Sequence, residues 1–342
     1  MTRTMFDCIG NTPLVRLETG NAPGHAFAKL ELANPFGMKD RVAKQAIVEA
    51  KRRGALRDGA PIVESSSGTM ALGIALVAAS LGHPVHIVSD PKGMDPITTA
   101  KLKALGCHLH VVERMGKGGW QGARLERLQE LLAQYPDAFW PRQYDNPDNP
   151  AAYTALAQEL LAELGGVDVL AGPVGSGGSL CGTARELRKT CPDLRVVAVD
   201  AVGSVIFGQP DSLDRRQRGL GNSIIPPNVD FSQIDEVHWL NDREAFTATL
   251  ELAREQQIFA GNSSGSCYAV LRYLSRQAAP GARIVGIFPD RGDRYVGTVY
   301  DPEYWRAHGI DALPVAAEPA EVPYGTPVQT WSRAHLPSER SR

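Results

Sequence analysis

A lysine follows a glycine-containing turn at the point where an apolar, helix-like pattern begins. The segment from Asn34 to Arg41 reads NPFGMKDR and places Lys39 two residues after Gly37. Helix N-termini favour acidic side chains, because the helix dipole is positive there. A lysine amine can act as a nucleophile towards a carbonyl group or as a general base. Lys39 is therefore a candidate catalytic residue, with a surface lysine in the first turn of a helix as the alternative.

The sequence GPVGSGGSLCG, from Gly172 to Gly182, is typical of a phosphate-binding loop. It follows the apolar run VDVLA and precedes a helix-like run. Glycines let backbone N–H groups approach a phosphate closely, and a helix N-terminus adds its dipole. Four glycines between Gly175 and Gly182 exceed what one tight turn requires. Ser176 and Ser179 could add hydroxyl donors.

Two serine-rich loops have a similar design and also lead into helix-like runs. Glu64 to Gly73 reads ESSSGTMALG, and Ala260 to Val270 reads AGNSSGSCYAV. Consecutive N–H groups and hydroxyls at a helix start suit a carboxylate. Ordinary helix capping is the alternative for each loop, since serines are common caps.

Lys39 and the three loops together predict a pyridoxal 5'-phosphate site. A lysine that forms a Schiff base with this cofactor requires a phosphate cradle, a partner for the pyridine nitrogen and a carboxylate site for an amino acid. The three loops can supply those parts.

Strand-like and helix-like runs alternate through most of the chain, which predicts an α/β fold with parallel sheets covered by helices. The strand-like runs include PIVES, PVHIVSD, CHLHVVE, VDVLAGPVG, LRVVAVD and ARIVGIFPD. In such folds ligands bind at the carboxyl edge of the strands, where the three loops lie. A dinucleotide site is the rival interpretation, because Asp200 lies 25 residues after Gly175. The GxGxxG pattern fails there, however, since Leu180 occupies its third glycine position.

Composition excludes several classes of protein. The chain has 342 residues, a net charge of −2, 43% hydrophobic and 22% charged residues, which indicates a globular protein with no nucleic-acid or membrane partner. The N-terminus lacks a signal-peptide pattern, so we expect a cytoplasmic protein. The five scattered cysteines predict buried thiols, and the eight histidines predict no metal site. His108 and His110 alternate and are expected to form a structural pair on one strand face.

The sequence resembles the cysteine synthase and cystathionine β-synthase family, which has the type II fold of pyridoxal-phosphate enzymes. The resemblance runs from IGNTPLVRL (9–17) to FPDRGDRYVGTVYD (288–301), and NPFGMKDR resembles the segment that carries the family's Schiff-base lysine. It implies two parallel-sheet domains with the cofactor in the cleft between them. We expect a large cofactor domain (1–34 and 146–304), a smaller mobile substrate domain (35–145), a poorly ordered tail (305–342) and a homodimer.

The resemblance also implies roles for individual residues. Lys39 is the Schiff-base lysine, GSGGS holds the phosphate, Ser263 bonds the pyridine nitrogen, and Thr69 stands where an asparagine normally contacts the 3'-oxygen. The residues that would bind the cofactor are Lys39, Thr69, Gly175, Ser176, Gly177, Gly178, Ser179 and Ser263. Those that would bind the substrate, mainly through its carboxylate, are Ser66, Ser67, Gly68, Met70 and Gln143.

The function that follows is β-replacement on an activated L-serine, through an aminoacrylate intermediate, with Lys39 as general base. ESSSG and PDRGDRY resemble the synthases of 2,3-diaminopropionate precursors, so an amino-acid nitrogen is an alternative nucleophile to sulfide. A β-eliminating lyase is a further alternative. The run Arg215-Arg216-Gln217-Arg218 favours O-phosphoserine over O-acetylserine as the donor, because arginine pairs well with phosphate. Arg218, beside Gly219, is the best candidate, although a charge run is often a solvated loop.

Overall fold

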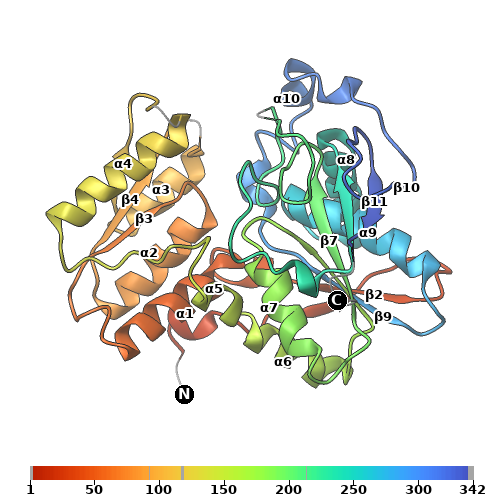
Figure 1. The fold of residues 1–342 in the computed structure, drawn as a ribbon, viewed down its shortest axis with the longest axis horizontal. Helices are drawn as coiled ribbons and strands as arrows, with labels where there is room; N and C mark the ends of the chain where they lie inside the picture. The colour runs from red at the N-terminus through yellow and green to blue at the C-terminus, as the bar shows by residue number, and fades with distance from the viewer. Residues whose placement is uncertain (1–2, 92, 117–118, 213, 338–342) are drawn as a thin grey trace. The chain divides into compact units, whose positions relative to one another are not determined.

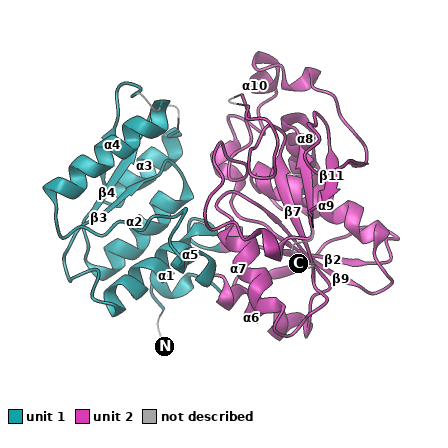
Figure 2. Cartoon of the chain, viewed as in Figure 1, with its two compact units in different colours: residues 1–10, 34–152 teal, residues 11–33, 153–342 magenta. Residues whose placement is uncertain are grey.

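The computed structural model describes residues 3–91, 93–116, 119–212 and 214–337. These residues form two compact units (Figure 2). Unit 1 comprises residues 1–10 and 34–152, and unit 2 comprises residues 11–33 and 153–342. Compared with the predicted domains, the first ten residues belong to the smaller unit, and residues after 304 belong to the larger one.

Unit 1 contains a parallel three-stranded sheet in the order β3-β4-β5 (Figure 1). Its strands are β3 (Ile62–Ser65), β4 (Val85–Ser89) and β5 (His108–Val111). Its helices are η1 (Met5–Cys8), α1 (Lys39–Arg52), α2 (Thr69–Leu81), α3 (Pro96–Ala104), α4 (Gly119–Gln134) and α5 (Asp148–Ala151). Residues 70 to 78 of α2 are all buried, as expected for a helix that is apolar on every side.

Unit 2 is built on an eight-stranded sheet in the order β1-β2-β9-β6-β7-β8-β11-β10 among the described residues. Strands β2, β9, β6, β7 and β8 run parallel, and β1 and β11 pair antiparallel with β2 and β8. The strands are β1 (Leu14–Arg16), β2 (His25–Lys29), β6 (Val169–Pro173), β7 (Arg195–Ala201), β8 (Glu236–Leu240), β9 (Arg283–Ile287), β10 (Ala320–Glu321) and β11 (Ser332–His335). The helices are η2 (Glu31–Ala33), α6 (Thr154–Leu164), α7 (Gly178–Leu187), η3 (Phe231–Gln233), α8 (Asp242–Gln256), α9 (Asn262–Gln277), η4 (Gly292–Tyr295), α10 (Pro302–Ala307) and η5 (Ile310–Ala312).

The central strands of both units are buried, which explains their continuous apolar runs. All residues of β4, β6 and β8 are buried, as is typical of parallel sheets covered by helices on both faces. Each of the six strand-like runs in the sequence forms one strand. The fold class predicted from the alternating pattern is therefore the one observed.

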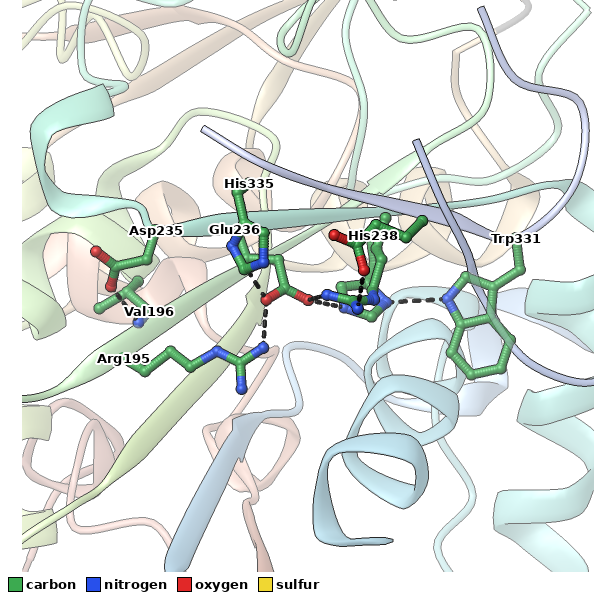
Figure 3. Close-up of polar contacts among 9 residues, drawn as sticks. Arg195, Val196, Asp235, Glu236, His238, Trp331 and His335 are labelled. Atoms are coloured by element: carbon green, nitrogen blue, oxygen red, sulfur yellow. Dashed lines mark hydrogen bonds and ion pairs between the residues drawn. The ribbon is translucent and has the colours of Figure 1, made fainter. Parts of the chain in front are cut away.

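The segment after residue 304 differs from the loosely ordered tail that its proline content predicted. Strand β11 extends the main sheet along β8, and Trp331 is only 6% exposed. The Trp331 Nε1 donates to His238 Nδ1 over 3.1 Å, as Figure 3 shows. Glu236, fully buried, accepts from His238 and pairs with Arg195 (Figure 3). Residues 338–342 of the predicted tail lie outside the described residues.

The predicted histidine pair in β5 is joined by a third histidine from β4. The His86 ring lies 4.7 Å from the His108 ring and 5.3 Å from the His110 ring, both stacked. Within the described part of the chain, no group of three or more acidic, histidine or cysteine side chains could hold a metal ion. The five cysteines are free thiols, as predicted. Only Cys181 and Cys267 are buried, however, whereas Cys8 is exposed and Cys107 and Cys191 are partly exposed. No described helix is long and apolar enough to cross a membrane.

Candidate active site

Lys39 is the first residue of α1 and follows a turn that suits glycine. Gly37 has a φ of 131°, and the N–H of Phe36 donates to the Oδ2 of Asp40 over 2.8 Å. Desolvation by burial lowers the pKa of Lys39 from 10.5 to about 8. A larger fraction of the amine is then neutral near pH 7, which is the form that bonds a carbonyl carbon or accepts a proton.

The loop from Ser65 to Gly68, here called the serine loop, connects the carboxyl end of β3 to α2. Ser66 is buried, and Gly68 is the extended N-cap of α2. The first N–H groups of a helix have no partner within the helix and so favour an anion. The serine loop therefore has the donors that a substrate carboxylate requires.

Two further residues of the predicted site begin α2. Thr69 is its first residue and is partly exposed. Met70 is only 2% exposed, because its side chain packs into the core of unit 1. A part for Met70 in substrate binding is thus restricted to its backbone N–H.

Arg124, on α4, contacts the serine loop and was not found by sequence analysis. Its Nη1 donates to Ser67 Oγ over 3.0 Å and lies 3.3 Å from Asp90 Oδ2. Ser67 Oγ also lies 2.7 Å from Ser89 Oγ, at the end of β4. The Nε of Arg124 is buried and has no hydrogen-bond partner among the described residues. In the sequence this arginine is one of several charges on an amphipathic helix, so its position gave no signal.

Gln143 lies close to the strand that leads into the serine loop. The chain before it runs beside β3, with Phe139 bridged to Ile62. Trp140 Nε1 donates to Glu64 Oε1 over 3.1 Å, and the backbone of Gln143 also donates to Glu64. Burial raises the pKa of Glu64 to about 7. The structure thus brings Gln143 and the serine loop to the same edge of the unit 1 sheet.

The loop from Val174 to Gly178 in unit 2, here called the glycine loop, lies between β6 and α7. Gly177 is the N-cap of α7 with a φ of 83°, and a Cβ there would lie 2.7 Å from the Cα of Val229. Gly175 has a similar constraint, since its Cβ would lie 3.0 Å from the carbonyl oxygen of Gly219. The loop is therefore closely packed on one side and leads directly into the N-terminus of α7. Backbone N–H groups at a helix N-terminus suit a phosphate.

Arg218 has its backbone fixed and its side chain exposed. Its N–H donates to Asn262 Oδ1 over 3.2 Å, and the Asn262 amide donates back to its carbonyl oxygen over 3.0 Å. Arg215, in contrast, binds its own loop through the carbonyl oxygen of Gly203 and Asp211. Of the predicted basic run, Arg218 is therefore better placed to bind an outside anion than Arg215.

Ser263 is fully buried in the first turn of α9. A Cβ at Gly219 would lie 3.6 Å from Ser263 Oγ, so Ser263, the 218–221 segment and the glycine loop converge within unit 2. β6 and β7 are neighbouring parallel strands, which explains why the glycine loop and the 218–221 segment, which follow them in the chain, meet at one sheet edge. Asp200, the acid of the rival dinucleotide interpretation, is fully buried within β7 and so is unsuited to bind a ribose.

These residues fit the cofactor that the sequence predicts. A closely packed glycine loop at a helix N-terminus suits its phosphate, and the buried Ser263 hydroxyl suits a ring nitrogen. Burial lowers the pKa of Lys39, which increases the fraction of neutral amine that can bond an aldehyde. Each unit, taken by itself, thus has groups whose chemistry suits pyridoxal phosphate.

Comparison with known proteins also points to a pyridoxal-phosphate enzyme. A family model described as "Pyridoxal-phosphate dependent enzyme" matches residues 5–290. The chain is 41% identical to the N-(2-amino-2-carboxyethyl)-L-glutamate synthase of Cupriavidus metallidurans, over 92% of this chain and 96% of that protein. It is 38% identical to the protein of the same name from Ralstonia nicotianae, over 89% and 91% of the two chains. Among solved structures, the O-acetylserine dependent cystathionine β-synthase of Helicobacter pylori matches with a TM-score of 0.80 and 31% identity, over 87% of this chain and 98% of that one.

Proposed function

The chain belongs to the pyridoxal-phosphate dependent enzyme family, and on this premise we propose that it joins an activated L-serine to the nitrogen of an amino acid. The observation that carries the proposal is its similarity, along most of its length, to two N-(2-amino-2-carboxyethyl)-L-glutamate synthases. That name describes a product in which the nitrogen of glutamate is bonded to the β-carbon of an alanine unit. We therefore propose L-glutamate as the nucleophile of a β-replacement reaction.

The residues of the cofactor site have distinct roles in this proposal. When bound, pyridoxal phosphate supplies an electron sink for reactions at the α- and β-carbons of an amino acid. Lys39 bonds the cofactor and later takes the α-proton as general base. The backbone N–H groups of Gly175 to Ser179 hold the phosphate, and the Ser263 hydroxyl bonds the ring nitrogen. The Thr69 hydroxyl contacts the 3'-oxygen of the cofactor ring.

The substrate site consists of the serine loop, the N–H of Met70, Gln143 and Arg124. The N–H groups and hydroxyls of Ser66 to Gly68 bind the α-carboxylate of the serine donor. Arg124 orients the Ser67 hydroxyl through its Nη1 and adds a positive charge to this carboxylate site, which the ion pair with Asp90 partly offsets. Arg218 binds the phosphate of the donor, which we propose is O-phosphoserine.

One product assay tests the proposal against its alternatives. The purified protein, loaded with pyridoxal phosphate, is given O-phosphoserine or O-acetylserine, each with L-glutamate, with sulfide or with no nucleophile. We expect the glutamate adduct from O-phosphoserine as the fastest product. Cysteine as the main product would instead identify a cysteine synthase. Pyruvate and ammonia at a rate independent of added nucleophile would identify a β-eliminating lyase.

We further propose a cytoplasmic homodimer in which unit 1 binds the substrate and moves during the reaction. The family resemblance supports the homodimer and the movement, and the free cysteines support the cytoplasm. Light scattering of the purified protein tests the oligomeric state: a mass near 74 kDa, about twice the 36.9 kDa chain, is expected.

A further inference from the structure

The backbone of the segment 216–218, within the basic run, is held by polar groups of unit 2. The N–H groups of Arg216 and Gln217 donate to the two carboxylate oxygens of Asp242 over 3.0 and 3.1 Å. Asp242 is the first residue of α8. The Gln217 side chain is 7% exposed, and its amide donates to the carbonyl oxygen of Leu240 over 2.9 Å. The chain therefore reaches Arg218 with both preceding residues fixed.

Asn262 binds the backbone of Arg218 at two points. Asn262 is fully buried and is the first residue of α9. Its Oδ1 accepts from the N–H of Arg218 over 3.2 Å, and its Nδ2 donates to the carbonyl oxygen of Arg218 over 3.0 Å. The backbone partners dictate which end of the amide is the oxygen, since an N–H only donates and a carbonyl oxygen only accepts. Because none of these groups titrates, the pairing does not depend on pH.

The side chain of Arg218 extends from this fixed backbone. It is exposed, and no described residue pairs with its guanidinium through a hydrogen bond or an ion pair. Burial raises the pKa of Tyr295 well above its ordinary value, and the charge of Arg218 is among the effects that oppose this rise. Tyr295 is hydrogen-bonded to Asp290, which lies 3.2 Å from Ser263 Oγ. The positive charge of Arg218 therefore lies near the residues that surround Ser263.

A fixed backbone at Arg218 matters more for a phosphate than for an acetyl group. A guanidinium can donate two parallel hydrogen bonds to a phosphate, and this geometry is favoured when little freedom is lost on binding. An acetyl ester is neutral and has no need of such a partner. Gly219 and Gly221, with φ values of 84° and 71°, follow directly and would by themselves leave the segment flexible. The contacts of Asn262 and Asp242 restrain it.

We propose that Asn262 is a positioning residue that determines donor specificity, because it holds Arg218 where the guanidinium binds the phosphate of O-phosphoserine. This deepens the proposed function and rests on its assignment of Arg218 to the donor. Asp242 acts in the same way on the two residues before Arg218. Without Asn262 the chain retains the arginine, but the guanidinium is spread over many positions and binds phosphate less well.

Donor preference in single variants tests the role of Asn262. The full chain, loaded with pyridoxal phosphate, is given O-phosphoserine or O-acetylserine with L-glutamate, and kcat/KM is determined for each donor. Asn262→Ala should lower kcat/KM for O-phosphoserine about tenfold more than for O-acetylserine. Gln209→Ala is the matched control, because Gln209 is also buried and its amide also bridges two backbone groups, those of Thr326 and Val328. It should leave the preference unchanged.

A double variant separates positioning of the arginine from a general effect on unit 2. In protein that already carries Arg218→Ala, Asn262→Ala should change the donor preference no further. An equal loss for both donors, or a selective loss that persists without the arginine, overturns the proposal. If Asn262→Ala does not fold, Asp242→Asn places an amide N–H₂ against a backbone N–H and should give the same selective loss. An unchanged preference in that variant also overturns the proposal.

The same measurements distinguish a failure of this inference from a failure of the proposed function. If Arg218→Ala affects both donors equally, the proposed role of Arg218 is wrong and the inference falls with it. A selective loss in Arg218→Ala but not in Asn262→Ala rejects the role of Asn262 alone. If neither donor is consumed, the affinity of the loaded protein for inorganic phosphate, measured by calorimetry, replaces kcat/KM. Asn262→Ala should then weaken phosphate binding only where Arg218 is present, and an unchanged affinity overturns the proposal.

Discussion

The amine of Lys39 must be neutral to bond an aldehyde, and its surroundings favour that form. Desolvation lowers its pKa to about 8, so the neutral fraction rises with pH, reaches one half at about pH 8 and levels off from about pH 9. The rate at which cofactor-free protein takes up pyridoxal phosphate should follow this curve, as measured by absorbance. A rate that continues to rise to about pH 10, the behaviour of an ordinary lysine, would contradict the lowered pKa. Lys39→Ala should show no borohydride-reducible attachment.

Arg124 provides a second prediction for a single residue. Its Nη1 is bonded to Ser67, so Arg124→Ala removes a charge from the proposed carboxylate site. We expect the KM for the serine donor to rise by about 10- to 100-fold, the loss of a charge-assisted hydrogen bond. Arg127→Ala is the matched control on the same helix, because Arg127 pairs with Glu130 at the surface. Equal KM values in the two variants would show that Arg124 does not bind substrate.

The sequence offered Lys39 and the loop residues as candidates, whereas it gave no indication of the contacts that Arg124 and Asp290 make. The loops have local signals, namely glycines and serines at the junction of a strand and a helix. Arg124 and Asp290 reach Ser67 and Ser263 across 57 and 27 residues of sequence. Such contacts depend on strand order and helix packing, which one sequence does not reveal. The type of residue 263 alone therefore gave an incomplete view of its hydrogen bonding.

At the scale of the element, the junction of β6 and α7 depends on Gly177. A side chain there would meet Val229 and would also require a positive φ. Gly177→Ala should therefore weaken cofactor binding by on the order of tenfold or more, as measured by fluorescence titration. Gly165→Ala separates the two effects, since Gly165 has a φ of 70° but nothing within 4 Å of its Cβ. Cofactor affinity that falls equally in both variants would indicate general strain rather than a phosphate loop.

At the scale of the whole molecule, the segment after residue 304 completes the main sheet. Trp331 is buried and hydrogen-bonded to His238, so Trp331→Ala should lower the free energy of unfolding by about 3 to 5 kcal/mol. Urea denaturation followed by circular dichroism measures this loss. Tyr324→Ala, in the same segment but 37% exposed, should cost less than about 1 kcal/mol. Similar losses in both variants would mean that β11 adds no particular stability.

The parallel sheets were predictable because their strands are buried on both faces and read as continuous apolar runs. The comparisons confirm the family, the fold class, the enzyme class and the cofactor. The order of the tail was not predictable, because SRAH in β11 has no strand pattern of its own. It forms a strand by pairing with the edge of β8 opposite β7, next to the buried Glu236 and His238. Local composition carries no information about such an edge.

The account is tested most directly by a competition between nucleophiles. The protein, loaded with pyridoxal phosphate, is given O-phosphoserine together with equal concentrations of sulfide and ¹⁵N-labelled L-glutamate. The products are separated and identified by mass spectrometry. We predict that the main product contains the labelled nitrogen bonded to the carbon that carried the phosphate. Cysteine as the main product, or pyruvate with no labelled adduct, would contradict the proposed function.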